Sequence, residues 1–120
     1  MTPKALHKYL MSLAAVKQVV QWGDHYVYKV GDKVFAIGGA PDEKFSGLTF
    51  KTSEDSFEIL MQQKGIERAP YLTRGNWVKL TKMSALTDKQ LKAYLARSHA
   101  IIAATLTKKK RAALGPSGRR

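Results

Sequence analysis

The segment from residue 25 to residue 37 constrains the fold most, because its sequence has the pattern of a β-hairpin. Residues 25–30 and 33–37 are rich in aromatic and β-branched side chains, and Gly31 and Asp32 between them favour a tight turn. The chain is therefore predicted to contain an antiparallel sheet. The other predicted strands are the runs 19–22, 47–51 and 77–80.

Three segments carry the signals of α-helix ends. Thr2 before Pro3 predicts an N-cap for the first helix, since proline fits the first helical position. Residues 52–64 carry a cap and first-turn acids for a second helix. Thr87 and Gln90 form a capping box for the last helix. The side chains expected to face the core from this last helix are Leu91, Leu95, Ser98, Ile102 and Leu106.

Together these elements predict a fold of the α+β class, in two layers, with an antiparallel sheet and the helices packed on one of its faces. The predicted order is roughly α-β-β-β-α-β-α, with the run 19–22 as an additional early strand and residues 65–76 as an irregular connector. Residues 1–107 are predicted to form a single domain, and residues 108–120 a basic, partly flexible C-terminal tail.

Composition excludes several classes of site. The 120 residues include no cysteine, which rules out disulfide frameworks, thiol nucleophiles and cysteine-based zinc sites. No apolar stretch approaches the roughly 18 residues of a membrane span, and no signal peptide is recognisable. The chain is therefore expected to be soluble and cytoplasmic. Because His7, His25 and His99 have no metal-ligand spacing, we expect no catalytic site, metal or cofactor.

The excess positive charge of the chain is confined to its C-terminal part. Residues 1–67 contain equal numbers of lysines and acids, whereas residues 68–120 contain a single acid, Asp88, and carry the whole net charge of +12. A segregated positive field attracts polyanions. The sequence therefore predicts DNA as the partner, with RNA as an alternative, bound by phosphate contacts with little sequence preference. The predicted nucleic-acid-binding residues are Arg68, Arg74, Lys79, Lys82, Lys89, Lys92, Arg97, Lys108, Lys109, Lys110 and Arg111.

Both tryptophans are predicted to be packing anchors. Trp22 precedes a tight turn at Gly23, and Trp77 opens an apolar strand. An alternative for Trp77 is a stacking platform for unpaired bases, which it would share with Tyr71 and Arg74.

Several short sequences, in their order and spacing, are similar to those of one family. They are residues 22–25 (Trp-Gly-Asp-His), 29–36, 48–51, 69–72, 77–78 and 106–109. Over about residues 4–114 the chain resembles the MmcQ/YjbR-like family of small bacterial proteins. The resemblance implies a fold like that of the type III secretion chaperones, an antiparallel sheet with helices packed against it. It also implies the family's usual description as DNA-binding proteins, without a catalytic motif.

Other partners remain open alternatives. The secretion-chaperone-like fold suggests a protein-interaction or chaperone-like module, in which an apolar sheet face or groove receives a partner segment. A weaker alternative is attraction of the polybasic tail to anionic lipid. Thr107, where the family often has proline, permits the last helix to continue into residues 108–111. A monomer is favoured over an oligomer.

Overall fold

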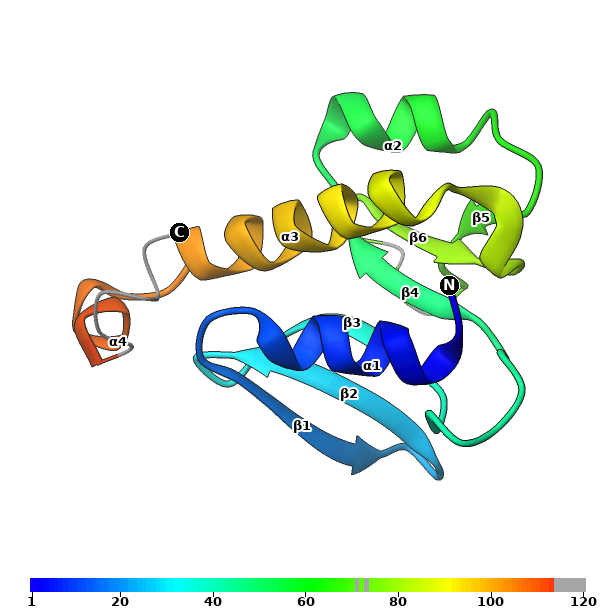
Figure 1. The fold of residues 1–120 in the computed structure, drawn as a ribbon. Helices are drawn as coiled ribbons and strands as arrows, with labels where there is room; N and C mark the ends of the chain where they lie inside the picture. The colour runs from blue at the N-terminus through cyan, green and yellow to red at the C-terminus, as the bar shows by residue number, and fades with distance from the viewer. Residues whose placement is uncertain (71, 73, 114–120) are drawn as a thin grey trace.

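A single antiparallel sheet forms one layer of the molecule (Figure 1). The computed structural model describes residues 1–70, 72 and 74–113, with side chains as far as Lys110. The sheet has six strands in the order β1-β2-β3-β4-β6-β5, and every neighbouring pair is antiparallel. The strands are β1 (Val16–Gln21), β2 (His25–Val30), β3 (Lys33–Gly38), β4 (Leu48–Lys51), β5 (Ile66–Arg68) and β6 (Trp77–Leu80).

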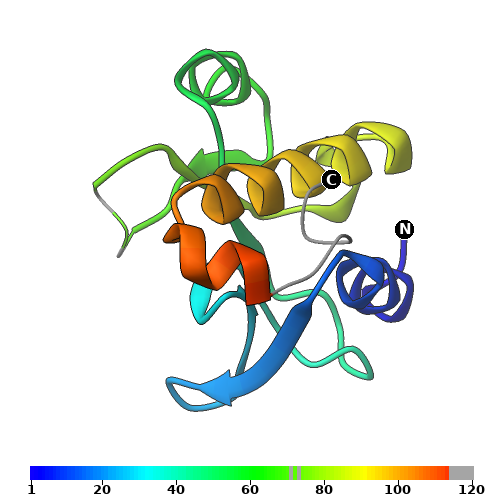
Figure 2. The same cartoon turned by 90° about the vertical axis from the view of Figure 1, so that its left-hand side faces the viewer.

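The helices pack against one face of this sheet (Figure 1). The first packs against β1, the second against β6, and the third against β3 and β4. A short fourth helix lies beyond the C-terminal end of the third (Figure 2). The helices are α1 (Pro3–Ser12), α2 (Glu54–Leu60), α3 (Asp88–Ala104) and α4 (Lys108–Ala113), with one 3-10 turn, η1 (Met83–Ala85). The predicted two-layer α+β architecture is therefore confirmed.

The helix caps form as the sequence predicts. The Thr2 side chain accepts a hydrogen bond from the backbone N–H of Ala5 at 3.1 Å. At the start of α3, the Thr87 hydroxyl accepts from the Gln90 N–H at 3.1 Å, and the Gln90 side chain accepts from the Thr87 N–H at 3.0 Å. Each bond satisfies an amide that the first helical turn would leave unpaired.

Helices α1 and α3 run side by side in the same direction. The amino group of Met1 lies 2.9 Å from a carboxylate oxygen of Asp88, so the two helices start together. Further along, the Tyr9 hydroxyl donates to the Lys92 carbonyl at 2.9 Å. These contacts make α1 and α3 one continuous layer over the sheet.

The core fills the space between the helices and the sheet. Leu6 and Leu10 of α1 and Leu91 and Leu95 of α3 are buried there against the inward side chains of the strands. Ser98 is also buried, as its place in the predicted inward stripe requires. Its hydroxyl donates to the Phe35 carbonyl of β3 at 2.8 Å and accepts from the Lys51 N–H of β4 at 3.0 Å.

Four elements differ from the prediction. Strand β1 begins three residues earlier and ends before Trp22, because the chain turns at Trp22 with φ +54°. Helix α2 ends at Leu60, and the chain then turns toward Gly65 at φ +85°. Strand β5 lies inside the segment predicted to be irregular. Helix α4 is separate from α3, because the chain leaves the helix after Ala104.

The chain after α3 packs on the turn between β2 and β3. Leu106 is buried, and a Cβ on Gly31 would lie 2.5 Å from its Cδ1 atom. The Lys110 ammonium lies 3.3 Å from a carboxylate oxygen of Asp32. The described part of the C-terminal tail is thus the helix α4, and Arg119 and Arg120 lie outside the described residues.

Candidate nucleic-acid interface

Five exposed cations lie on the outer surface of α1 and α3. Lys89, Lys92 and Arg97 of α3 were among the predicted residues, and the neighbouring helix α1 adds the exposed Lys4 and Lys8. We call these five residues the helix-layer group. The two α1 lysines were missed because they belong to the half of the chain whose charges cancel. Their spacing of four residues, which places them on one side of a helix, is the signal that points to them.

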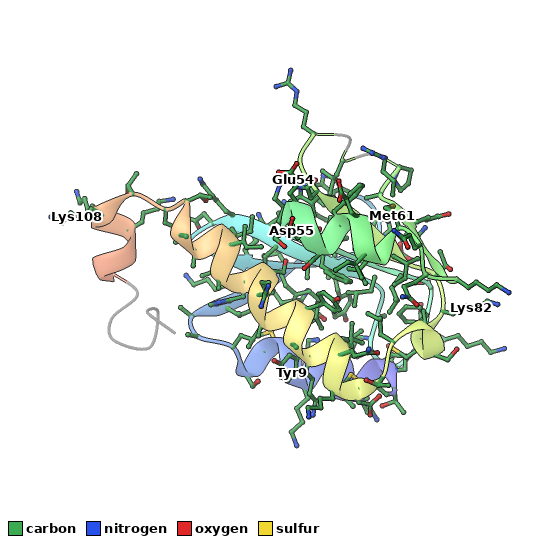
Figure 3. The ribbon with its side chains drawn as sticks, turned by 90° about the horizontal axis from the view of Figure 1, so that it is seen from above. Tyr9, Glu54, Asp55, Met61, Lys82 and Lys108 are labelled. Atoms are coloured by element: carbon green, nitrogen blue, oxygen red, sulfur yellow. The ribbon has the colours of Figure 1, made fainter. Side chains whose placement is uncertain are left out.

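Helix α2 limits this basic surface. Its exposed side chains include Glu54 and Asp55, which Figure 3 labels, and Glu58. The two acids of the first turn interact favourably with the helix dipole at that end. The basic character of the outer helix surface therefore belongs to α1 and α3 and does not extend over α2.

The remaining predicted cations do not join the helix-layer group. Lys82 and Lys108 lie at opposite ends of the molecule in Figure 3. Arg74 is exposed in the segment before β6, and the guanidinium of Arg68 lies 4.9 Å from the ring centre of Phe57. Lys108, Lys109 and Lys110 are on α4, Lys79 is on the opposite sheet face, and the side chain of Arg111 lies outside the described residues. Basic residues that are close in the sequence therefore lie on several separate surfaces of the protein.

Most cations in the described part of the chain have no acidic partner. Within residues 1–70, 72 and 74–110, the contact between Lys110 and Asp32 is the one ion pair formed by a lysine or arginine side chain. The other ion pair there joins the N-terminal amino group to Asp88. Most positive charges of the described part are therefore not neutralised by an acid within the protein.

No helix of the described residues covers the opposite face of the sheet. Strand register places side chains from five strands in one row across it, because side chains directly opposite each other lie on the same face. Lys17, Lys29 and Lys51 lie along one side of this row, and Lys79 lies within it. We call this surface the helix-free face, and its described strand residues include Lys17, Val19, Val27, Lys29, Ile37, Thr49, Lys51 and Lys79.

A hollow of about 480 Å³ lies in the helix-free face. Its lining is largely apolar, and Lys79 is the cation among its described lining residues, none of which is an acid. We call it the sheet hollow. The residues that define it best are Trp22, His25, Ile37, Thr49, Leu72 and Lys79.

A glycine makes room for the lysine of the sheet hollow. Gly47 has φ +128°, and a Cβ at this position would lie 2.8 Å from the Cε atom of Lys79. The lysine side chain therefore passes over the backbone of Gly47, in space that any other residue would fill. The stem of Lys79 therefore lies against the backbone of Gly47 at the sheet hollow.

The two tryptophans differ from each other in burial. The prediction that Trp22 is a packing anchor is wrong, because its side chain is 62% exposed at the rim of the sheet hollow. The left-handed backbone at Trp22 directs the ring away from the core. Trp77 is half-buried against the core, as predicted, and the Lys51 ammonium lies 5.6 Å from the centre of its ring. Tyr71, the third member of the predicted stacking platform, lies outside the described residues.

Two of the histidines form hydrogen bonds within the protein. The Nδ1 atom of His7 lies 2.7 Å from the Tyr28 hydroxyl, and the Nε2 atom of His99 lies 2.7 Å from the Ala14 carbonyl oxygen. Burial, with a smaller contribution from Tyr26, raises the pKa of Tyr28 to about 12. No group of three His, Asp or Glu side chains suited to a metal ion occurs in the described part of the chain.

The described helices include none with the length and apolar character needed to cross a bilayer.

Comparisons with known proteins agree with this architecture. A crystal structure of the Deinococcus radiodurans protein DR2400, described as a DUF419 domain, superposes with a TM-score of 0.82 at 22% identity, covering 95% of this chain and 88% of that one. A Pseudomonas syringae protein superposes with a TM-score of 0.69 at 17% identity, covering 85% of this chain and 99% of that one. Among curated proteins, none matches this sequence. The family model named YjbR matches residues 11–101, and the chain therefore belongs to the YjbR family.

Proposed function

We propose that the protein binds nucleic acid through phosphate contacts, with little preference for sequence. The observation that supports this most directly is the number of exposed cations without an acidic partner, of which the helix-layer group holds five on two adjacent helices. Each cation that neutralises a phosphate of duplex DNA releases condensed counterions, which makes binding favourable at low salt.

The nature of the cations favours phosphate contact over base reading. Four of the five members of the helix-layer group are lysines, whose charge sits at the end of a flexible side chain. Reading of bases in a groove requires donors held in fixed geometry, such as a bidentate arginine. Arg97 is the one arginine of the group, and it is exposed on α3. We therefore expect affinity to depend on salt far more than on sequence.

Salt titration with matched variants tests the proposal. Binding of a fluorescein-labelled 20-base-pair duplex is measured by anisotropy at several KCl concentrations. Replacing Lys8 and Lys89 with glutamine removes two contacts of the helix-layer group, which should reduce the slope of log affinity against log salt by about 1.8. The control replaces two exposed lysines that lie elsewhere, Lys44 and Lys64, and removes the same charge.

The result distinguishes a defined surface from general attraction. If the slope of log affinity against log salt is smaller for the Lys8 and Lys89 variant than for the Lys44 and Lys64 variant, the duplex binds at the helix-layer group. Equal slopes would show that only the net charge matters. Failure of the wild-type protein to bind the duplex at 50 mM KCl and micromolar concentration would overturn the proposal.

A further inference from the structure

We infer that the helix-free face binds unpaired nucleotides of single-stranded nucleic acid, with one base in the sheet hollow against Trp22 and the adjoining phosphates at the surrounding lysines. The inference rests on the proposed function and adds a second surface with a different ligand. It concerns the face of the sheet opposite the helix-layer group, where the sequence half of zero net charge contributes most of the cations.

The first argument is the charge of this face. Lys17 of β1 and Lys29 of β2 are directly opposite each other in the strand register. Like charges in this position repel and cost stability. Neither lysine forms an ion pair with another described residue. A phosphate placed between the two ammonium groups would relieve the repulsion, and this pair therefore favours an anionic ligand.

A second pair of lysines lies on strands β4 and β6 of the same face. Lys79 pairs with Thr49 and Lys51 pairs with Trp77, so the two lysines are diagonal neighbours on adjacent strands. Such neighbours are separated by about 7–8 Å. Glu67, opposite Lys79 in β5, is the one acid in this part of the strand register. The face thus presents four lysines to one glutamate.

The third argument is the shape and chemistry of the sheet hollow. Its volume of about 480 Å³ falls within the range of roughly 300–1,000 Å³ that is typical of sites for small organic groups. An apolar lining with one lysine suits a flat, apolar group attached to an anion, which describes a nucleobase with its phosphate. Trp22 at the rim offers an exposed ring for stacking. Bases in a duplex are stacked and paired inside the helix, so only unpaired nucleotides have a base available for this hollow.

The lysines also argue against a second copy of the chain as the occupant. A two-fold contact through the helix-free face would bring Lys17, Lys29, Lys51 and Lys79 of one copy against the same four lysines of the other. One glutamate on each copy cannot neutralise them. Charge complementarity therefore selects a polyanion, although the apolar side chains Val19 and Trp22 are exposed there.

The test measures the binding of a single-stranded and a duplex ligand to two variants. One variant changes an exposed residue of the helix-free face, and the other changes an exposed residue of the helix side. Loss of one stacked base should weaken binding of labelled dT12 by the Trp22→Ala variant about 5- to 150-fold, and leave binding of a 12-base-pair duplex unchanged. Ile59→Ala, which removes an apolar side chain that is 55% exposed on α2, is the matched control and should bind both ligands as the wild type does. Circular dichroism checks that each variant is folded.

A spectroscopic measurement reports on contact with Trp22 itself. The chain has two tryptophans, so the Trp77→Phe variant leaves Trp22 as the single indole. Titration with dT12 should then quench the tryptophan fluorescence, and Lys79→Gln in the same background should require a higher dT12 concentration.

The outcomes separate this inference from the proposed function. If duplex DNA binds but Trp22→Ala and wild type bind dT12 equally, the inference is overturned and the proposed function stands. If neither ligand binds to the wild type, both fail. If Trp22→Ala converts a dimer to a monomer in sedimentation and leaves dT12 affinity unchanged, the helix-free face is a contact between copies and the inference is overturned.

Discussion

Replacing Ser98 with alanine should destabilise the protein strongly, although serine and alanine differ by a single oxygen atom. The Ser98 side chain is 0% exposed, and its hydroxyl stands between β3 and β4, bonded to the Phe35 carbonyl at 2.8 Å and to the Lys51 N–H at 3.0 Å. The substitution leaves two backbone groups without this partner. Each buried group left unpaired costs about 1–3 kcal/mol, so for the two groups we expect a loss of about 2–6 kcal/mol in the free energy of unfolding.

Urea unfolding followed by far-ultraviolet circular dichroism measures this loss. The midpoint should fall while the dependence on urea concentration stays the same, since the substitution does not change the area exposed on unfolding. Ser84→Ala, at an exposed serine in η1, is the control and should change stability by less than about 0.5 kcal/mol. A Ser98→Ala protein as stable as the control would refute the reasoning, because β3 and β4 would then have closed into a direct hydrogen bond.

Three further outcomes are expected. Burial raises the pKa of Tyr28 to about 12, so the folded chain keeps a proton that the unfolded chain releases near the ordinary value of 10.0. The urea midpoint of the wild type should therefore fall as pH rises from 10 to 12. The midpoint of the Tyr28→Phe variant should fall less over the same range, and an equal fall would be evidence against the assignment. Gly31→Ala places a Cβ against Leu106 at a position with positive φ, and it should lower the free energy of unfolding by about 1–3 kcal/mol. Gly23→Ala, at a position with positive φ but open space around it, should lower it less. The reverse order in urea unfolding would contradict the packing argument. Removal of residues 108–120 lowers the formal charge from +12 to +6 and should reduce the salt dependence of duplex binding; an unchanged slope in the same anisotropy titration would exclude the tail from binding.

Local signals in the sequence predicted much of the fold. The caps at Thr2 and Thr87 depend on residues three positions away, and both formed. The hairpin around Gly31 also depends on neighbours alone. Strand β5 was missed because its three residues are too few to show alternation, and because it pairs with β6, whose residues follow 10 to 14 positions later.

The candidate surfaces were harder to predict, because they depend on strand pairing. A run of basic residues in the sequence need not be a surface in space, and Lys79 and Lys89 lie on opposite sides of the sheet. The lysines of the helix-free face, such as Lys17 and Lys29, lie among acids in the sequence and are brought together by the register of β1 and β2. The exposure of Trp22 depends on one backbone angle, which composition does not reveal.

The position of β6 within the sheet has a consequence for synthesis on the ribosome. Strand β4 pairs with β6, not with β5. A nascent chain that ends before residue 77 therefore leaves β4 with an unpaired edge, and exposed edges of this kind promote aggregation. Translation must reach Trp77–Leu80 before the edge is closed, which makes the interval between these two strands the vulnerable period in the biogenesis of the protein.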